Sequence, residues 1–221
     1  MQSLDHAARK AIAAHYAQLG HQLHARWKFA NDPVYAATAA LLGDSTLPLL
    51  DIGCGIGLLG QYLSAAGVRV AYTGVDHDVR KIGAAQVAAR RAGLEHAQRL
   101  HCADAATLPP THGHVALLDV LHYLPAARQR ALLKTATQHL APGGLLVIRN
   151  VLCESNWRFH ATRLEEFFLA VSGWIPGGVQ HYPRAHELRV PLEDAGLEVH
   201  LTPLRGRTPF NSYLIVARPL R

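Results

Sequence analysis

The sequence predicts an α/β protein built on one mostly parallel sheet, and three features of the chain support this prediction. Between residues 49 and 151, short apolar segments of strand-like character alternate with longer segments of helical periodicity. A glycine-rich turn, Gly53–Gly57, separates the first of these strands from the helix that follows it. Two further strands, 197–204 and 211–218, follow each other without a helix between them. Because parallel neighbours need a long crossover, these last two strands are expected to be antiparallel.

Length and composition fit an ordinary globular α/β protein. The 221 residues, of which 49% are hydrophobic and 17% charged, are enough for one sizeable buried core. No run of about 18 apolar residues exists, so no membrane-spanning helix is expected. The segment Met1–Lys10 lacks the apolar centre of a signal peptide. Three widely spaced cysteines make neither a disulfide framework nor a zinc site, and a cytoplasmic, reducing location is expected.

The chain is basic, with a formal net charge of +6. Such a charge can attract nucleic acid or acidic partners. The basic residues are nevertheless scattered, and pairs such as Arg90-Arg91 do not extend into a dense run. The 15 histidines include no H-x-x-x-H pair, which would place two ligands on one helix face. No metal site is therefore expected.

The N-terminal part of the chain is predicted to be helical. Residues 4–29 carry apolar side chains at helical spacing, and Gly20 either ends one helix or lies between two. Asp32-Pro33 suits a helix start, because aspartate is a favoured N-cap and proline is tolerated in the first turn. A short helix, Tyr35–Leu42, is expected to follow.

The first predicted strand, Leu49–Ile52, is apolar except for Asp51. Gly53, Gly55 and Gly57 follow it and give the backbone conformational freedom without a Cβ. A ligand can therefore approach the main chain there, near the positive end of the next helix. The apolar face of that helix consists of Leu58, Leu59, Tyr62 and Leu63.

An aspartate follows each of the next two predicted strands. Val68–Val75 alternates, is rich in β-forming residues and leads into Asp76. An acid at this position, about 20 residues beyond a glycine turn, is placed to accept hydrogen bonds from ribose hydroxyls. The third strand, Gln98–Cys102, is followed by Asp104.

The rest of the chain continues the alternation and then departs from it. Val115–Asp119 and Leu145–Val151 are the fourth and fifth predicted strands, and 152–183 is an insertion of high aromatic density. The predicted helices are Val79–Ala92, with Asp78 as its N-cap, then Pro125–Leu140, and finally Pro183–Ala195, in which Pro191 is expected to cause a kink or a split.

The segment Asp51-Ile52-Gly53-Cys54-Gly55-Ile56-Gly57 resembles motif I of the class I S-adenosylmethionine (SAM) dependent methyltransferases, an acid followed by G-x-G-x-G. The resemblance covers roughly residues 45–219. It implies a Rossmann-like, doubly wound fold with a seven-stranded, mostly parallel sheet, an antiparallel C-terminal strand and helices on both faces. It also implies SAM as cofactor, S-adenosylhomocysteine as product and no metal. The expected division is a helical cap, 1–44, followed by a SAM-binding domain, 45–221.

The resemblance also implies which residues bind the cofactor. Asp76 would accept hydrogen bonds from the ribose, His77 would lie against the adenine, and Asp104 with the Ala105 amide would bind the adenine amino group. Asp119 and Val120 would contact the methionine end. The remaining implied contacts come from the motif I residues Asp51, Gly53, Cys54, Gly55 and Gly57.

The acceptor side is less defined by the sequence. His122 and Tyr123 follow the fourth strand and are the titratable groups expected nearest the reaction centre. The insertion is expected to act as a lid, with Trp157, His160 and Tyr182 facing the ligand. A histidine has an ordinary pKa that suits a general base at neutral pH, and His122 or His160 is the candidate. The N-terminal helices either cover the cofactor or only cover the edge of the sheet.

Several alternatives remain open at this point. The spacing Gly55-x-Gly57-x-x-Gly60 also satisfies the dinucleotide fingerprint of nicotinamide-dependent oxidoreductases. The acids after the first and third strands and the antiparallel C-terminal pair favour SAM instead. A SAM-binding protein without catalytic activity would have the same pattern.

The class of acceptor is inferred from two motifs that the chain lacks. The [DN]-P-P-[YF] motif is absent after the fourth strand, and no cysteine has the Pro-Cys context of cytosine methylation. A small aromatic acceptor is the first choice, and RNA is the alternative because of the positive charge. The fragments 25–29, 157–159 and 208–211 faintly resemble bacterial methyltransferases of aryl-polyene pigment clusters, which implies an aromatic acid or its acyl-carrier-protein thioester. The oligomeric state is left open.

Overall fold

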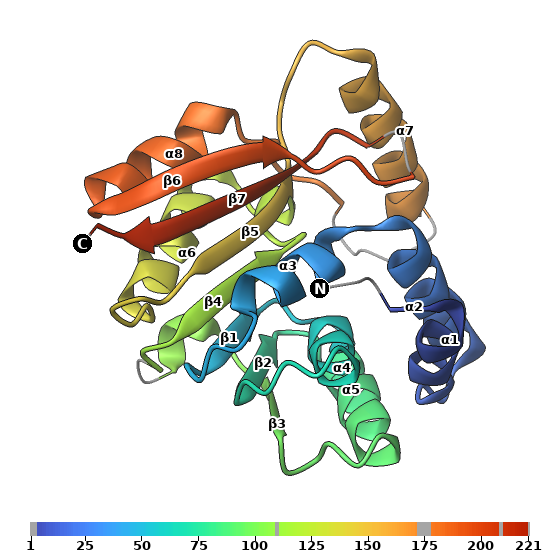
Figure 1. The fold of residues 1–221 in the computed structure, drawn as a ribbon. Coiled ribbons are helices and arrows are strands. Elements are labelled where there is room, and N and C mark those ends of the chain that lie inside the picture. Colours follow the sequence, from blue (N-terminus) through green and yellow to red (C-terminus); the bar gives the residue numbers. More distant parts are fainter. Residues whose placement is uncertain (1–3, 109–110, 172–177, 208–209, 221) are drawn as a thin grey trace.

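The computed structural model describes residues 4–108, 111–171, 178–207 and 210–220, with only the backbone at Ala105 and at 165–171. This part of the chain contains a seven-stranded sheet of order β3-β2-β1-β4-β5-β7-β6 (Figure 1). β7 runs antiparallel to both of its neighbours, and the other strands share one direction. The strands are β1 (Leu49–Ile52), β2 (Tyr72–Asp76), β3 (Gln98–Cys102), β4 (His114–Leu118), β5 (Leu146–Val151), β6 (Leu197–Pro203) and β7 (Ser212–Pro219).

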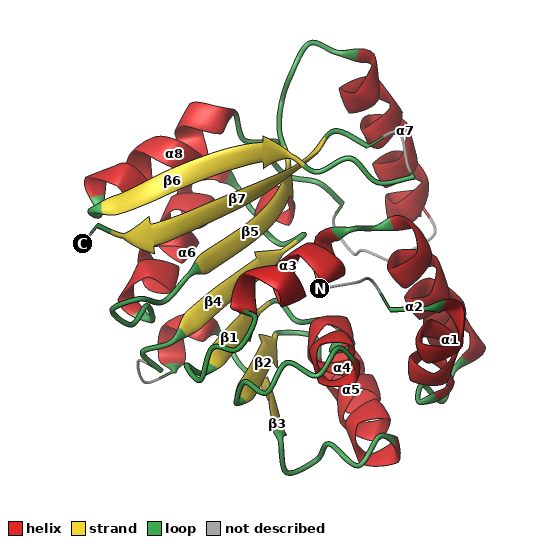
Figure 2. Ribbon diagram, in the orientation of Figure 1, coloured by secondary structure: helices red, strands yellow, loops and turns green. Residues whose placement is uncertain are grey.

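Helices cover both faces of the sheet (Figure 2), as the sequence predicts. α4 and α5 lie over one face, and α6 and α8 lie over the other (Figure 1). The helices are α1 (His6–Ala14), α2 (Leu19–Asn31), α3 (Val34–Leu42), α4 (Leu58–Ala65), α5 (Val79–Arg91), α6 (Ala126–Gln138), α7 (Trp157–Val171) and α8 (Ala185–Asp194).

Successive residues of the central strands point into different cores, because side chains alternate across a sheet. Leu49 packs in the core that contains α4 and α5, whereas Leu50 packs in the core that contains α6 and α8. The same alternation places Ala116 in the first core and Leu117 in the second. Both faces are buried, which explains why these strands are almost wholly apolar. The Rossmann-like sheet with an antiparallel C-terminal strand is confirmed.

The N-terminal helices differ in detail from the prediction. The predicted helix 4–29 is two helices, and the break lies at residues 15–18. Gly20 is neither the end of a helix nor the residue between two, because it lies in the first turn of α2. Asp5 caps α1 by accepting a hydrogen bond from the Ala8 amide at 2.8 Å. The sequence pattern places the expected helix end or break at Gly20 instead, because apolar spacing continues across residues 15–18.

The start of β2 also differs from the prediction, and of the kink or split expected at Pro191 the split does not occur. β2 begins at Tyr72 and not at Val68, since its pairing with β1 begins with Leu49 opposite Tyr72. α8 is continuous through Pro191 rather than split. Leu188 and Leu192, on either side of the proline, are both fully buried and hold the two halves of the helix on the same core.

The insertion contains a helix, α7, that the sequence analysis did not predict. Asn156 caps it, because its side-chain oxygen accepts a hydrogen bond from the Phe159 amide at 2.8 Å. α7 and the C-terminal half of α2 lie beyond the carboxyl ends of the parallel strands (Figure 1). Among the described residues, no helix is long and apolar enough to cross a membrane.

Candidate functional site

The glycine turn has the backbone conformation that its sequence predicts. Gly53, Gly55 and Gly57 have φ angles of 75°, 55° and 76°, in the region that favours glycine. A Cβ at Gly53 would overlap the side chain of Val120, so this glycine lets the end of β1 pack on the loop after β4. At Gly55 no heavy atom lies within 4 Å of the position a Cβ would take. The turn therefore presents open backbone at the start of α4.

Asp76 connects this turn to the end of β2. One carboxylate oxygen accepts a hydrogen bond from the Gly55 amide at 2.9 Å, and the other accepts one from the Asp78 amide at 2.9 Å. The spacing of Asp76 from the glycine turn predicts the ribose contact but gives no sign of this second role. A carboxylate has about four lone-pair sites, so two hydrogen bonds leave capacity for ribose hydroxyls. The His77 side chain is 94% exposed beside it, with Nδ1 at 3.5 Å from the Asp76 carboxylate.

Asp51 lies inside the sheet, below the turn. Its side chain is buried and accepts a hydrogen bond from the Tyr72 hydroxyl at 2.5 Å. The pKa of Asp51 is raised to about 7, chiefly by burial; the Tyr72 hydrogen bond opposes this shift and the nearby Asp76 adds to it. The sequence identified Asp51 and missed Tyr72, whose hydroxyl is the partner of this carboxylate.

Asp104 lies at the same edge of the sheet, because pairing of Asp76 with Cys102 aligns the ends of β2 and β3. It is exposed, and its carboxylate accepts a hydrogen bond from the Ala106 amide at 2.9 Å. This contact belongs to the short 3-10 helix Ala105–Thr107. The contacts of Asp104 and Ala105 with adenine remain predictions.

Asp119 occupies a left-handed conformation, with φ of 61°, directly after β4. Its carboxylate pairs with Lys28 of α2, at 2.9 Å, and with Arg149 of β5. Asp32 belongs to the same ion-pair network, at 3.1 Å from Lys28 and 3.5 Å from Arg149. Burial alone would raise the pKa of Asp32, but Arg149 and Lys28 hold it at about 2. The network thus ties the N-terminal helices to the ends of β4 and β5.

Sequence reasoning missed this network, although one signal was available. Arg149 is the charged residue within the stretch 145–151, which is apolar apart from Arg149 and Asn150, and it is only 7% exposed in the structure. A buried charge is costly unless it is paired. A charged residue at position 149 therefore predicts acidic partners. It does not predict that these partners follow α2 and β4.

His122 is buried in the short 3-10 helix Leu121–Tyr123, next to Asn150 of β5. The oxygen Oδ1 of Asn150 lies 3.3 Å from the His122 amide nitrogen and 2.8 Å from Nδ1 of the ring. An amide can only donate, so the Asn150 atom must be the oxygen. The ring nitrogen Nδ1 must then carry a proton, and in the neutral imidazole Nε2 carries the lone pair.

Three predicted acceptor-side residues lie together. The ring of His122 is 4.1 Å from the ring of Tyr123, and it stacks on Tyr182 at 6.3 Å with an interplanar angle of 6°. The His122 carbonyl accepts hydrogen bonds from the amides of Gln180 and His181, which fixes the segment that carries Tyr182. His160 and Trp157 lie outside this cluster, where α7 is exposed.

Comparison with known proteins identifies the family. The sequence profile described as "Methyltransferase domain" matches residues 19–202. The chain belongs to the class I SAM-dependent methyltransferases. A ubiquinone biosynthesis O-methyltransferase from Rhizobium leguminosarum bv. trifolii (strain WSM2304) is 30% identical to this methyltransferase over 158 residues. The match covers 69% of the chain and 60% of that relative, so the chain spans about 60% of the length of the curated relative it matches.

Solved structures agree on the fold. The magnesium protoporphyrin IX methyltransferase (ChlM) from Synechocystis PCC 6803, with bound SAH, has a TM-score of 0.69 to this methyltransferase at 18% identity. That match covers 97% of this chain and 94% of the other. An O-methyltransferase from neocarzinostatin biosynthesis, in complex with SAM and 2-hydroxy-5-methyl naphthoic acid, has a TM-score of 0.64 at 20% identity and covers 90% and 55% of the two chains.

The residues of this methyltransferase fit the cofactor of its family. The open backbone at Gly55, the start of α4 and the buried carboxylate of Asp76 together suit an adenosyl group with ribose hydroxyls. Among the described residues, no three His, Cys, Asp or Glu side chains form a group that could hold a metal ion. Family membership also favours methyl transfer over the nicotinamide-dependent alternative.

Proposed function

We propose that this methyltransferase methylates a hydroxyl group of a small aromatic acceptor, as a free acid or as a carrier-protein thioester. The observation that carries the proposal is the His122 ring, which Asn150 holds in one tautomer and which contacts the rings of Tyr123 and Tyr182. This arrangement lies directly after β4, next to Val120, which packs on the glycine turn. Small-molecule O-methyltransferases among the relatives support the same chemistry.

The chain's own residues would do three things in this reaction. SAM supplies an activated methyl group when bound, so no covalent residue of the protein is required. The tyrosine rings would hold the acceptor within about 3–3.5 Å of that methyl group, because alignment supplies much of the rate in such a transfer. His122 would accept the acceptor's hydroxyl proton on Nε2, and Asn150 would hold the ring in the tautomer that makes this possible.

Substitution of His122 tests the proposal. We expect His122→Ala to lower turnover of a catechol or hydroxybenzoate acceptor at saturating SAM by about 10²–10⁴-fold, the usual contribution of a general base. Asn150→Ala should lower turnover less and shift the pH profile. Calorimetric titration with S-adenosylhomocysteine should give unchanged affinity in both variants.

His160→Ala is the matched control, because it removes the other candidate histidine from an exposed position on α7. Full turnover in His122→Ala would remove the general-base role. Methyl transfer to RNA, with none to any phenol, would replace the proposed acceptor by the RNA alternative. Failure of the protein to bind either SAM or its product at millimolar concentration would overturn the function altogether.

A further inference from the structure

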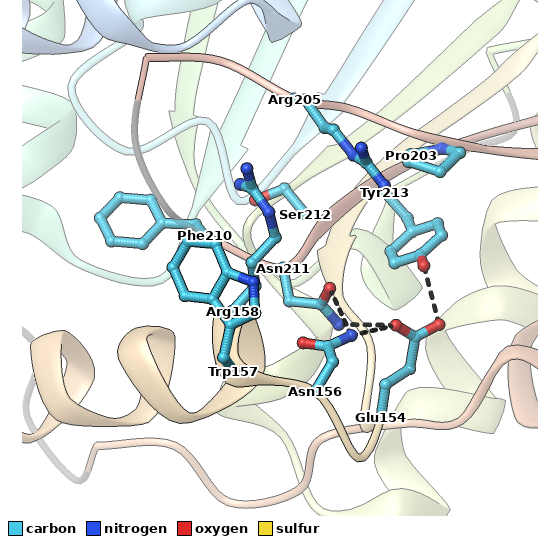
Figure 3. A pocket seen from close by; sticks show the side chains of 10 residues that line it. All are labelled: Glu154, Asn156, Trp157, Arg158, Pro203, Arg205, Phe210, Asn211, Ser212 and Tyr213. Atoms are coloured by element: carbon cyan, nitrogen blue, oxygen red, sulfur yellow. Dashed lines mark hydrogen bonds between the residues drawn. The ribbon is translucent and has the colours of Figure 1, made fainter.

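A second polar and aromatic site lies at the carboxyl end of β5, where β6 ends and β7 begins. It is a pocket of about 380 Å³ (Figure 3). Pairing of Val151 with Ser212 and of Pro203 with Tyr213 places it at the same edge of the sheet as the glycine turn. The first turn of α7 closes one side. Its lining is Glu154, Asn156, Trp157, Arg158, Pro203, Arg205, Phe210, Asn211, Ser212 and Tyr213.

Hydrogen bonds fix one end of this pocket. The Glu154 carboxylate accepts from the Tyr213 hydroxyl at 2.8 Å, from Asn156 at 2.7 Å and from Asn211 at 3.2 Å (Figure 3). Asn211 is itself buried, and its backbone amide donates a hydrogen bond to the Thr162 hydroxyl of α7 at 3.0 Å. This end of the pocket is therefore formed without a ligand. Neutral hydrogen-bond donors stabilise the Glu154 carboxylate.

The charged groups of the lining favour an anion. Among the lining residues that the structure describes, the two cationic side chains, Arg158 and Arg205, outnumber the one carboxylate, Glu154. Burial and the Glu154 hydrogen bond raise the pKa of the Tyr213 hydroxyl to about 12, while Arg205 acts in the opposite direction and so lies within electrostatic reach of the pocket's polar end. Guanidinium groups bind carboxylates and phosphates with strong, geometrically defined hydrogen bonds.

The other end of the pocket is aromatic. Trp157 and Phe210 lie together on the side opposite Glu154 (Figure 3). Trp157 is 64% exposed, which leaves a large apolar face open to a ligand. The Arg158 guanidinium lies 4.9 Å from the centre of the Trp157 ring, so cationic and aromatic surfaces adjoin. Phe210 also contacts Trp27 of α2, with ring centres 6.2 Å apart.

One side chain connects the pocket to the loop after β4. Ser212 lines the pocket, and its hydroxyl accepts a hydrogen bond from Nη2 of Arg149 at 2.9 Å. Nη1 of the same guanidinium pairs with Asp119, which precedes Val120. The Arg149 guanidinium group therefore lies between the pocket wall at Ser212 and the loop after β4, where methyl transfer is proposed.

We propose that this pocket binds the anionic end of the acceptor, with Arg158 and Arg205 holding the anion and with Trp157 and Phe210 holding the apolar part next to it. The inference rests on the proposed function and specifies its substrate class. The same anion chemistry has two sources, the carboxylate of a free aromatic acid and the phosphate of a pantetheine arm on a carrier protein.

Matched pairs of probes test the pocket. Calorimetric titration would compare 4-hydroxybenzoate with neutral 4-hydroxybenzamide, and 4′-phosphopantetheine with pantetheine. We expect the wild-type protein to bind at least one charged probe about tenfold more tightly than its neutral partner, the scale of one charge-assisted hydrogen bond. Arg205→Gln should reduce this preference, and Arg158→Gln combined with Arg205→Gln should abolish it. Arg163→Gln, on the same helix but outside the lining, is the control and should retain it.

Each outcome decides the inference. A preference for the benzoate alone identifies a free acid, and a preference for phosphopantetheine alone identifies a carrier-bound acceptor. Equal binding of charged and neutral probes by the wild type, or a preference that survives in the double variant, overturns the proposal. Arg205→Gln alters an exposed side chain and keeps the test usable if the double variant does not fold. Retained S-adenosylhomocysteine affinity in the same samples separates failure of this pocket from failure of the proposed function.

Discussion

Two buried aspartates at the carboxyl edge of this sheet have pKa values that are shifted in opposite directions. Asp51 is buried with a tyrosine hydroxyl as its partner, and its pKa rises to about 7. Asp32 is buried against Arg149 and Lys28, and its pKa falls to about 2. Burial penalises the carboxylate in both places, so the neighbouring charges decide the sign.

Asp51 should make stability depend on pH. The folded-state pKa of about 7 lies above the ordinary value of 3.8, so the folded chain keeps a proton that the unfolded chain has lost between these pH values. The stabilisation from protonated Asp51 is therefore fully present below about pH 4 and is lost as the pH rises through 7. We expect Asp51→Asn to gain stability relative to the wild type over this range, by a few kcal/mol (~1.4 per pKa unit).

Urea unfolding at pH 4.5 and pH 7, without cofactor, measures this difference. Asp44→Asn is the control, because Asp44 is exposed. A difference between Asp51→Asn and the wild type that stays constant with pH would contradict the argument.

Asp76 should matter for cofactor affinity through two routes. Asp76→Ala removes the acceptor predicted for the ribose and also the hydrogen bond that holds the Gly55 amide. We expect SAM binding to weaken by roughly 1.5–3 kcal/mol, the scale of hydrogen bonds to a charged acceptor. Asp78→Ala removes the N-cap of α5 instead and should cost about 1 kcal/mol of stability while leaving affinity intact. Calorimetric titration and urea unfolding separate the two effects, and equal affinity of Asp76→Ala and the wild type would refute the assignment.

At the scale of elements, α2 is attached to the sheet by charges as well as by apolar packing. Lys28 and Asp32, four residues apart at its C-terminal end, both join the network around Arg149. The loop after β6 approaches the same point, because a Cβ at Gly206 would overlap the Asn31 carbonyl. The end of α2 is therefore fixed over β4 and β5, next to the proposed acceptor site.

Removal of Arg149 should loosen this attachment. Arg149→Leu leaves the carboxylates of Asp32 and Asp119 without their buried partner and should destabilise the protein by about 3–5 kcal/mol. Lys28→Gln should cost less, since the Lys28 side chain is 16% exposed against 9% for Arg149. Urea unfolding gives the order, and hydrogen exchange in α2 shows whether this helix loosens first. A smaller cost for Arg149→Leu than for Lys28→Gln would show that the network does not hold the helix.

At the scale of the whole molecule, the N-terminal helices and the sheet share one core. Ile12 and Tyr16 of the N-terminal region pack in the same buried cluster as Leu58, Leu59 and Tyr72. The Tyr16 hydroxyl also donates a hydrogen bond to the Ile56 carbonyl of the glycine turn at 3.1 Å. The helices before β1 therefore contribute directly to the packing beneath the cofactor site.

We accordingly expect a single cooperative unfolding transition for the N-terminal helices and the sheet. S-adenosylhomocysteine at about 100 times its dissociation constant should stabilise the whole by about 2.7 kcal/mol. For a chain of this size the melting temperature should then rise by roughly 5–10 °C. Calorimetry with and without the ligand provides the measurement. Separate transitions, of which the ligand shifts only one, would show that the helices before β1 fold independently.

The sequence by itself determined the sheet, its glycine turn and the positions of Asp76 and Asp104 at the carboxyl ends of their strands. These features depend on local chemistry: period-two apolar patterns, the backbone freedom of glycine and the spacing of an acid from a turn. The family resemblance rested on the same local pattern. The exact position of the break, at residues 15–18 rather than at Gly20, and the helix α7 escaped prediction because apolar spacing and aromatic density do not fix helix ends.

Only the tertiary structure decided how the site is assembled. Lys28 and Asp119 are 91 positions apart, Glu154 and Tyr213 are 59 apart, and His122 and Asn150 are 28 apart. No local pattern encodes such pairs, because each depends on which strands become neighbours and on the register between them. The order β1-β4-β5-β7 brings the ends of these strands together and so places an ion-pair network, an oriented histidine and a cationic pocket at one edge.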